Sequence, residues 1–252
     1  MEIFRPKVSI ITCAYNSAAT IKDTLESVAG QNYSNIEHIL IDGCSKDETM
    51  SIIKGFNHNI RAISEPDKGI YDAMNKGIQI ATGDIVAILN SDDYYENADV
   101  VSDIVSLFQS SGVDTIYADL QYVDPQKTDR VVRKWHSGTY HPKSFLYGWM
   151  PPHPTFFAKR DLFEQYGLYD LSMGTASDYE LMLRFLVKFE CSTAYLNKTI
   201  VKMRAGGASN NSIQARFKAN KMDRLAWEKN GLKPYIFTTW LKPMRKIIQY
   251  FS

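Results

Sequence analysis

Two adjacent carboxylates, Asp92 and Asp93, have the residue types and spacing of a metal-binding site in this 252-residue chain. They follow the apolar run 85–89 and the polar pair Asn90-Ser91. Neighbouring carboxylates repel each other unless a positive charge lies beside them. Mg²⁺ and Mn²⁺ are commonly held by one or two carboxylates together with phosphate oxygens. The pair therefore predicts a divalent metal site for a bound diphosphate. The alternative is that the two residues cap a helix or occupy a solvated turn.

Asp42 and Tyr15 are candidates for recognition of a nucleobase. Asp42 ends the apolar segment 36–42, where its carboxylate could accept a hydrogen bond from a ring N–H. Tyr15 could stack on the base. Each residue also has a plain structural interpretation, because Asp before Gly43 is common in turns and Tyr15 could belong to the core.

Asp178 is the candidate general base, in a region far along the chain from the metal candidates. It stands near the start of a predicted helix, where an acidic residue is also favoured by the helix dipole alone. Glu180 is the competing carboxylate on the same helix. His153, in the Pro-rich stretch PPHPT, is either a ligand or a packed loop residue.

The elements that would position these side chains alternate regularly over the first 125 residues. Runs rich in β-branched residues alternate with segments whose apolar residues recur at helical spacing. This alternation predicts an α/β fold with a mostly parallel sheet and helices on both faces. Ligands bind such sheets outside the carboxyl ends of the strands. The predicted strands are 7–12, 36–42, 60–64, 85–89 and 114–123, and the predicted helices are 19–30, 47–56, 70–83 and about 100–108. A Pro-rich loop, a short strand and a helix are expected in 148–163, and a further helix in 176–189.

The composition is typical of a globular protein, with 44% hydrophobic and 23% charged residues. No apolar run approaches the roughly 20 residues that span a bilayer, and the first residues lack an apolar signal region. The three cysteines form no CxxC pair, which argues against a disulfide framework or structural zinc. A cytoplasmic protein is expected.

The charge is distributed unevenly. Residues 198–252 hold 12 Lys and Arg and two acidic residues, a net charge of +10, whereas residues 1–197 carry a net charge of −9. The end of the chain, 233–252, mixes aromatic and aliphatic residues with Lys and Arg. This pattern is typical of a segment that lies in a membrane interface, and it predicts association with the inner face of the cytoplasmic membrane. The alternative is that its apolar residues pack on the sheet domain.

Several segments resemble the family 2 glycosyltransferases with the GT-A fold, and in particular bacterial members that build surface polysaccharides. The resemblance covers about residues 6–190. The segments that carry it are 7–33, 36–49, 64–77, 73–95 and 176–185, in the order and at the spacing of the family.

The resemblance implies an inverting transfer of one sugar from a nucleotide-diphosphate sugar, expected to be a UDP-sugar, to a hydroxyl group. Asp178 would be the catalytic base, and Asp92 and Asp93 would bind Mn²⁺ or Mg²⁺. The nucleotide would contact Thr12, Ala14, Tyr15, Asn16, Asp42, Asp67, Lys68, Asn75 and Asp92. Weaker candidates for contact with the acceptor or the diphosphate are Trp149, His153 and Arg204.

The chain departs from the family pattern at two positions. Asn90 replaces the first Asp of the metal motif, and Ser177 replaces the Glu that often precedes the base. The Gln-x-x-Arg-Trp motif of processive members is absent, which favours addition of a single sugar.

The resemblance, together with the composition of the C-terminal segment, predicts an organisation and a set of partners. Residues 1–205 would form the catalytic domain, divided into a nucleotide-sugar part (1–125) and an acceptor part (126–205), and 206–252 a basic helical appendage. The expected partners are the donor, a glycan or lipid-linked glycan acceptor and an anionic membrane surface, but no nucleic acid. The alternatives are a nucleotidyltransferase, for which residues 12–18 lack the expected Gly-rich basic loop, and a binding module without catalysis.

Overall fold

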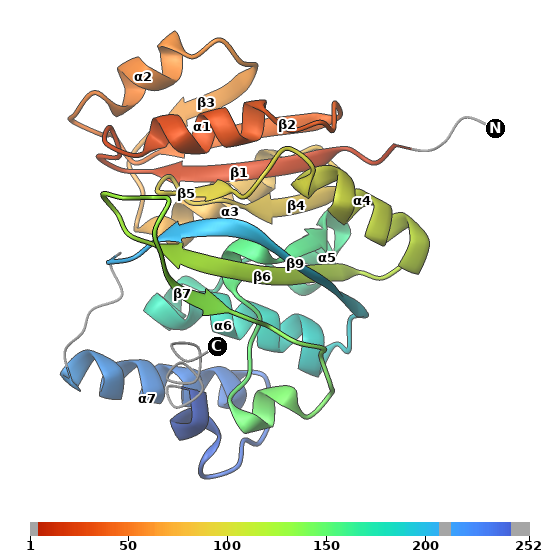
Figure 1. The fold of residues 1–252 in the computed structure, drawn as a ribbon. Coiled ribbons are helices and arrows are strands. Elements are labelled where there is room, and N and C mark those ends of the chain that lie inside the picture. The colour runs from red at the N-terminus through yellow and green to blue at the C-terminus, as the bar shows by residue number, and fades with distance from the viewer. Residues whose placement is uncertain (1–4, 207–212, 243–252) are drawn as a thin grey trace.

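The computed structural model describes residues 5–206 and 213–242 (Figure 1). For residues 213–218 it describes the backbone only. The described residues form one nine-stranded sheet in the order β3-β2-β1-β4-β8-β6-β9-β5, and β7 pairs with β6. The strands are β1 (Val8–Ala14), β2 (Ile36–Asp42), β3 (Ile60–Ser64), β4 (Ile85–Ile88), β5 (Asp93–Tyr95), β6 (Thr115–Val123), β7 (Val131–Trp135), β8 (Phe157–Lys159) and β9 (Thr193–Arg204).

The helices cover both faces of this sheet, as Figure 1 shows. They are α1 (Ile21–Ala29), α2 (Thr49–Gly55), α3 (Ile70–Ile80), α4 (Val100–Ser111), α5 (Arg160–Tyr166), α6 (Ser177–Leu183) and α7 (Ile213–Lys229). Short turns of other helix types are η1 (Ser144–Tyr147), η2 (His153–Thr155), η3 (Leu171–Ala176) and η4 (Arg184–Lys188).

The expected α/β fold is confirmed, and its parallel part lies where the alternation of strands and helices was regular. Strands β3, β2, β1 and β4 run parallel to one another. Strand β6 pairs in parallel with β9 and antiparallel with β7 and β8, and β8 pairs antiparallel with β4. The sheet is therefore mixed in its second half, and the predicted nucleotide and acceptor parts share it.

Strand β1 shows why the sheet is covered on both faces. Successive side chains of a strand point to opposite faces. Ile11 joins a core cluster with residues of α3 and α6, whereas Ile10 joins a second cluster with residues of α4. Helix α3 comes very close to β1 at Gly77, where an added Cβ would lie 2.4 Å from the Cγ2 of Ile11.

The described part of the C-terminal segment packs on the domain. The buried indole of Trp227, on α7, donates a hydrogen bond of 2.8 Å to the hydroxyl of Tyr179 on α6. Thr238 is buried and donates to the carbonyl of Leu146 at 2.7 Å. The backbone of the segment is therefore attached to the domain as far as residue 242, but Tyr235, Ile236, Phe237 and Trp240 stay exposed, so the packing of its apolar residues expected in the alternative is only partial. The remaining part of the predicted membrane segment, 243–252, lies outside the described residues.

Within the ranges 5–206 and 213–242, the structure contains no helix of the length and apolarity required to cross a bilayer.

Candidate active site

The site lies at the carboxyl ends of the parallel strands, where the loops after β1 and β2 are tied together. Asn16 follows β1 and adopts a positive φ of 50°. Its backbone N–H donates to Ser45 Oγ at 2.8 Å, and its side-chain oxygen accepts from the N–H of Lys46 at 2.9 Å. Tyr15 beside it is 63% exposed. Tyr15 therefore does not belong to the core, and its ring is open to a ligand.

Asp42 is fully buried at the end of β2. Its carboxylate accepts hydrogen bonds from the backbone and hydroxyl of Ser45 and from the hydroxyl of Ser64. This arrangement matches the turn interpretation of Asp42. Its role as a reader of the base stays a prediction, and it requires that a buried carboxylate gain one more donor.

Gly43 allows the loops after β2 and β3 to approach closely. A Cβ at this position would lie 2.5 Å from the Oδ2 of Asp67 and 3.4 Å from the ring of Tyr15. Asp67 also accepts a hydrogen bond of 2.8 Å from the N–H of Gly69, and Lys68 is exposed next to it. Asp67 and Tyr15 thus lie close together at Gly43, and their contact with a nucleotide stays a prediction.

Thr12 and Ala14 are buried within β1. The hydroxyl of Thr12 lies 3.1 Å from Nε2 of the buried His38 on β2. Burial, with His58 nearby, lowers the pKa of His38 to about 3. The side chains of Thr12 and Ala14 therefore support the strand and do not line the rim.

The two carboxylates of the predicted metal site have different surroundings. Asp93 is fully buried in β5, and Asn90 Nδ2 donates to its Oδ2 at 2.9 Å. Asp92 is only half-buried. Burial raises the pKa of both groups, and for Asp93 the neighbouring charge of Asp92 raises it further. Asp92 is thus the member of the pair that can reach a ligand directly.

The oxygen atoms at this site suit a hard divalent cation. Asn90 Oδ1 and Asp93 Oδ1 are buried and accept no hydrogen bond from the described residues. Together with the Asp92 carboxylate they are the type of ligand that Mg²⁺ and Mn²⁺ prefer. No group of three or more His, Cys, Asp or Glu side chains lies together in the described parts of the chain, so substrate oxygens and water would have to complete the coordination.

Arg204 stabilises the carboxylate loop from β9. Its guanidinium donates to the backbone carbonyl of Asp92 at 2.6 Å and forms an ion pair with Asp23. The residue is only 7% exposed. Arg204 therefore neutralises charge beside Asp92 and Asp93 from within the protein, and its contacts do not direct it toward a bound diphosphate.

Asp178 is half-buried at the start of α6 and faces two tyrosines. The hydroxyl of Tyr71, on α3, donates a hydrogen bond to its carboxylate. Burial and then the charge of Asp178 raise the pKa of both Tyr71 and Tyr169. The same charge partly offsets the effect of burial, which lowers the pKa of His153. The Nε2 of His153 lies 2.7 Å from the hydroxyl of Tyr169.

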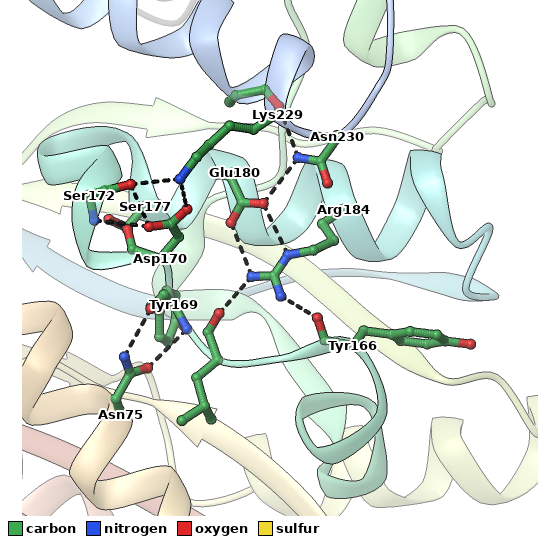
Figure 2. Close-up of polar contacts among 12 residues, drawn as sticks. Asn75, Tyr166, Tyr169, Asp170, Ser172, Ser177, Glu180, Arg184, Lys229 and Asn230 are labelled. Atoms are coloured by element: carbon green, nitrogen blue, oxygen red, sulfur yellow. Dashed lines mark hydrogen bonds and ion pairs between the residues drawn. The ribbon is translucent and has the colours of Figure 1, made fainter.

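Glu180, the competing candidate base, is occupied by a buried ion pair (Figure 2). Its two oxygens each accept a hydrogen bond of 3.0 Å from the guanidinium of Arg184, and Asn230, the residue after α7, donates to it at 3.0 Å. Arg184 also donates to the carbonyls of Tyr166 and Leu168. Glu180 therefore holds the loop before α6 in place, which leaves Asp178 as the available carboxylate on this helix.

Two further contacts position the same loop. The amide of Asn75, on α3, donates to the carbonyl of Tyr169 and accepts from its N–H, both at 2.9 Å (Figure 2). On the other side, Lys229 of α7 forms an ion pair with Asp170 and donates to Ser172 at 2.7 Å. Asn75, a predicted nucleotide contact, thus binds protein backbone in this structure.

Trp149, a weak acceptor candidate, belongs to the core. It is 5% exposed, its indole N–H donates to the carbonyl of Ser137 at 2.7 Å, and it packs on Tyr117 and Phe145. Its side chain lines no open surface, which corrects the expectation.

Three residues near Asp178 and Glu180 were not expected from the sequence: Tyr71, Tyr169 and Arg184. For Arg184 a signal existed, because Glu180 and Arg184 are four residues apart and such pairs meet on one helix face. The two tyrosines meet Asp178 only through the tertiary fold, and no local pattern indicates that.

The fold and this rim of polar loops are those of a GT-A glycosyltransferase. The sequence model of glycosyl transferase family 2 matches residues 9–174, and the chain belongs to this family. An uncharacterised glycosyltransferase of Mycobacterium tuberculosis is 35% identical over 182 residues, which cover 71% of this chain and 68% of the relative. A PGL/p-HBAD biosynthesis glycosyltransferase of Mycobacterium bovis is 30% identical over 218 residues, which cover 84% and 82%.

Solved structures support the fold. S. aureus TarS 1-349 in complex with UDP-GlcNAc superposes with a TM-score of 0.67 at 17% identity, covering 93% of this chain and 69% of that chain. A mannosyltransferase from Pyrobaculum calidifontis in complex with GDP-Man and Mn²⁺ gives 0.67 at 18% identity, covering 95% and 69%.

Proposed function

We propose that this glycosyltransferase moves one sugar from a nucleotide-diphosphate sugar, a UDP-sugar in the first instance, to a hydroxyl of a surface glycan or lipid-linked oligosaccharide, with inversion and with a divalent cation. The observation that carries this proposal is the environment of Asp178. It is the one carboxylate at the start of α6 that is half-buried and not locked in an ion pair, and Tyr71 donates to it.

The proposed transfer reaction uses Asp178, at the start of α6, as a general base. Asp178 would take the proton of the acceptor hydroxyl, whose oxygen attacks the anomeric carbon from the face opposite the leaving diphosphate. One displacement of this kind inverts the anomeric centre. The hydrogen bond from the Tyr71 hydroxyl would orient the carboxylate of Asp178.

The leaving diphosphate would lie at the rim near Asp92. A divalent cation bound there would offset the negative charge that develops on the leaving group. Asp92 would hold it directly, while Asn90 and Asp93 supply the adjacent oxygens. The complex of the Pyrobaculum mannosyltransferase with Mn²⁺ supports this choice of cation.

The nucleotide would lie over the exposed ring of Tyr15, between the loops that carry Asp42 and Asp67. The TarS complex with UDP-GlcNAc supports a uridine donor, whereas the mannosyltransferase complex contains GDP-Man. The name of the M. bovis relative, which refers to PGL/p-HBAD biosynthesis, supports a glycolipid or a related acceptor.

The test is release of the nucleoside diphosphate from a panel of UDP- and GDP-sugars, with Mn²⁺ and with EDTA. The proposal expects release from at least one UDP-sugar that requires the cation. Full release in EDTA would contradict the metal dependence, and release from GDP-sugars alone would contradict the choice of donor. Tight nucleotide binding without any turnover over a panel of acceptors would favour the non-catalytic alternative.

A further inference from the structure

An exposed aromatic ridge lies where η1 meets the segment after α7. It consists of Tyr147 (47% exposed), Tyr235 (43%), Ile236 (82%), Phe237 (45%) and Trp240 (54%). The ring of Tyr147 stacks on Phe237 at a centroid distance of 6.4 Å, and Tyr235 lies 5.2 Å from Phe237. Residues far apart in the sequence thus form one apolar surface.

The ridge rests on a packed support. Directly beneath it, Thr238 and Thr239 are buried, and Thr239 Oγ1 donates to the side chain of Asn220 on α7 at 3.0 Å. At Gly148, with φ of +74°, an added Cβ would lie 2.5 Å from the backbone nitrogen of Lys242. The fold therefore holds these side chains outward, because the backbone that carries them is fixed on its inner side.

The surroundings of the ridge carry positive charge. The two described segments that carry its residues, 136–160 and 230–242, contain no Asp or Glu. Lys143 and Lys233 are exposed within a few residues of its members. A contact between two copies through this ridge would bring these like charges together, because a two-fold interface places the same surface on both subunits.

We propose that the aromatic ridge is the surface by which the protein docks on an anionic lipid bilayer. Aromatic side chains favour the interface between headgroups and acyl chains. An aliphatic residue at the tip, Ile236, would enter the apolar layer, and the neighbouring lysines would meet anionic headgroups. The occupant of the ridge is thus a membrane interface, not a second protein chain.

The ridge is connected to the proposed catalytic base. Lys242 ends the described segment, and its ammonium lies 4.0 Å from the ring centroid of Tyr179, the residue after Asp178. Lys242 also forms an ion pair of 2.9 Å with Asp223 of α7. If the proposed transferase activity is correct, docking through the ridge would bring the base helix close to an acceptor carried on a lipid. Vesicle binding itself does not rest on that activity.

The experiment compares the full chain with the double variant Ile236→Ser and Phe237→Ser in sedimentation with vesicles of phosphatidylcholine, with and without phosphatidylglycerol. Val132→Ser is the matched control, because Val132 is 39% exposed on β7, away from the ridge. The double variant should lose at least about tenfold in partitioning, since two apolar side chains no longer leave water. The control should bind like the wild type, and both variants should keep UDP affinity.

Trp240 provides an independent readout. Lipids brominated on the acyl chain should quench its fluorescence when the ridge inserts, and the variant Trp240→Phe should lose this quenching while still sedimenting. Unchanged sedimentation of the double variant, or no sedimentation of the wild type, would overturn the proposal. A change from dimer to monomer in the double variant would overturn it in favour of a second copy. Equal binding to vesicles without phosphatidylglycerol would overturn the role of charge.

Discussion

The side chain of Asn75 and the backbone of Tyr169 form a closed pair of hydrogen bonds, each of 2.9 Å, between residues 94 positions apart. This contact joins α3 to the loop before α6, the helix that carries the proposed base Asp178. We therefore expect Asn75 to act on the proposed base through Tyr169 rather than on the nucleotide.

Replacement of Asn75 by Ala should lower the transfer rate and leave UDP affinity nearly unchanged. It should also cost about 1–3 kcal/mol of unfolding free energy, because two hydrogen bonds are lost. Calorimetry with UDP and Mn²⁺ and steady-state rates distinguish the two effects. Asn59→Ala is the control, because Asn59 is exposed. A large loss of UDP affinity would instead support Asn75 as a nucleotide contact.

Removal of Glu180 should destabilise the protein strongly. Glu180→Ala leaves the buried guanidinium of Arg184 without its partner, and breaking such a pair typically costs about 3–5 kcal/mol. Glu164→Ala is the control, because its ion pair with Arg160 is exposed and should contribute less than about 1 kcal/mol. Urea denaturation measures both. If Glu180→Ala is fully stable but inactive, Glu180 and not Asp178 is the base.

The two carboxylates of the proposed metal site should respond differently to substitution. Asp92→Asn should greatly weaken activation by Mn²⁺, because Asp92 is the half-buried member that can reach the cation. Asp93→Asn should also lower activity but should not destabilise the fold, because it removes a buried charge. Activity as a function of Mn²⁺ concentration measures the first effect. The exposed Asp129→Asn should behave like the wild type, and an Asp92→Asn enzyme with normal Mn²⁺ activation would contradict this assignment.

Stability should fall as the pH drops below about 6.5, because His38 stays neutral in the folded protein. Its pKa is lowered to about 3, from a normal value of 6.5, so the unfolded chain binds a proton more readily in this range. The expected loss between pH 7 and pH 5 is about 2 kcal/mol from this group. His38→Gln does not titrate there and should show a flatter profile in urea denaturation. Identical pH dependence of the two proteins would contradict the prediction.

The first half of the fold was predictable because strands and helices alternate there with clear periodicity. Strand β5 has only three residues, and β9 mixes polar and apolar residues and shifts register against β6, so neither shows a local pattern. At the site, local motifs were enough to single out Asp92 and Asp178 as candidates, and their roles stay predictions. The surroundings of a site residue could not be predicted where its contact partner is distant in the sequence. Trp149 lies in the core, where the carbonyl of Ser137 accepts a hydrogen bond from its indole N–H. Asn75 binds the backbone of Tyr169, which is 94 residues away in the sequence.

The most direct test of the central claim is the rate of sugar transfer by Asp178→Asn compared with the wild type, with UDP affinity measured on the same preparations. The substitution keeps the size of the side chain but removes the base. Transfer should fall by about 10²–10⁴-fold, while UDP and Mn²⁺ bind as in the wild type. A variant that transfers sugar at the normal rate would contradict the assignment of Asp178 as the catalytic base.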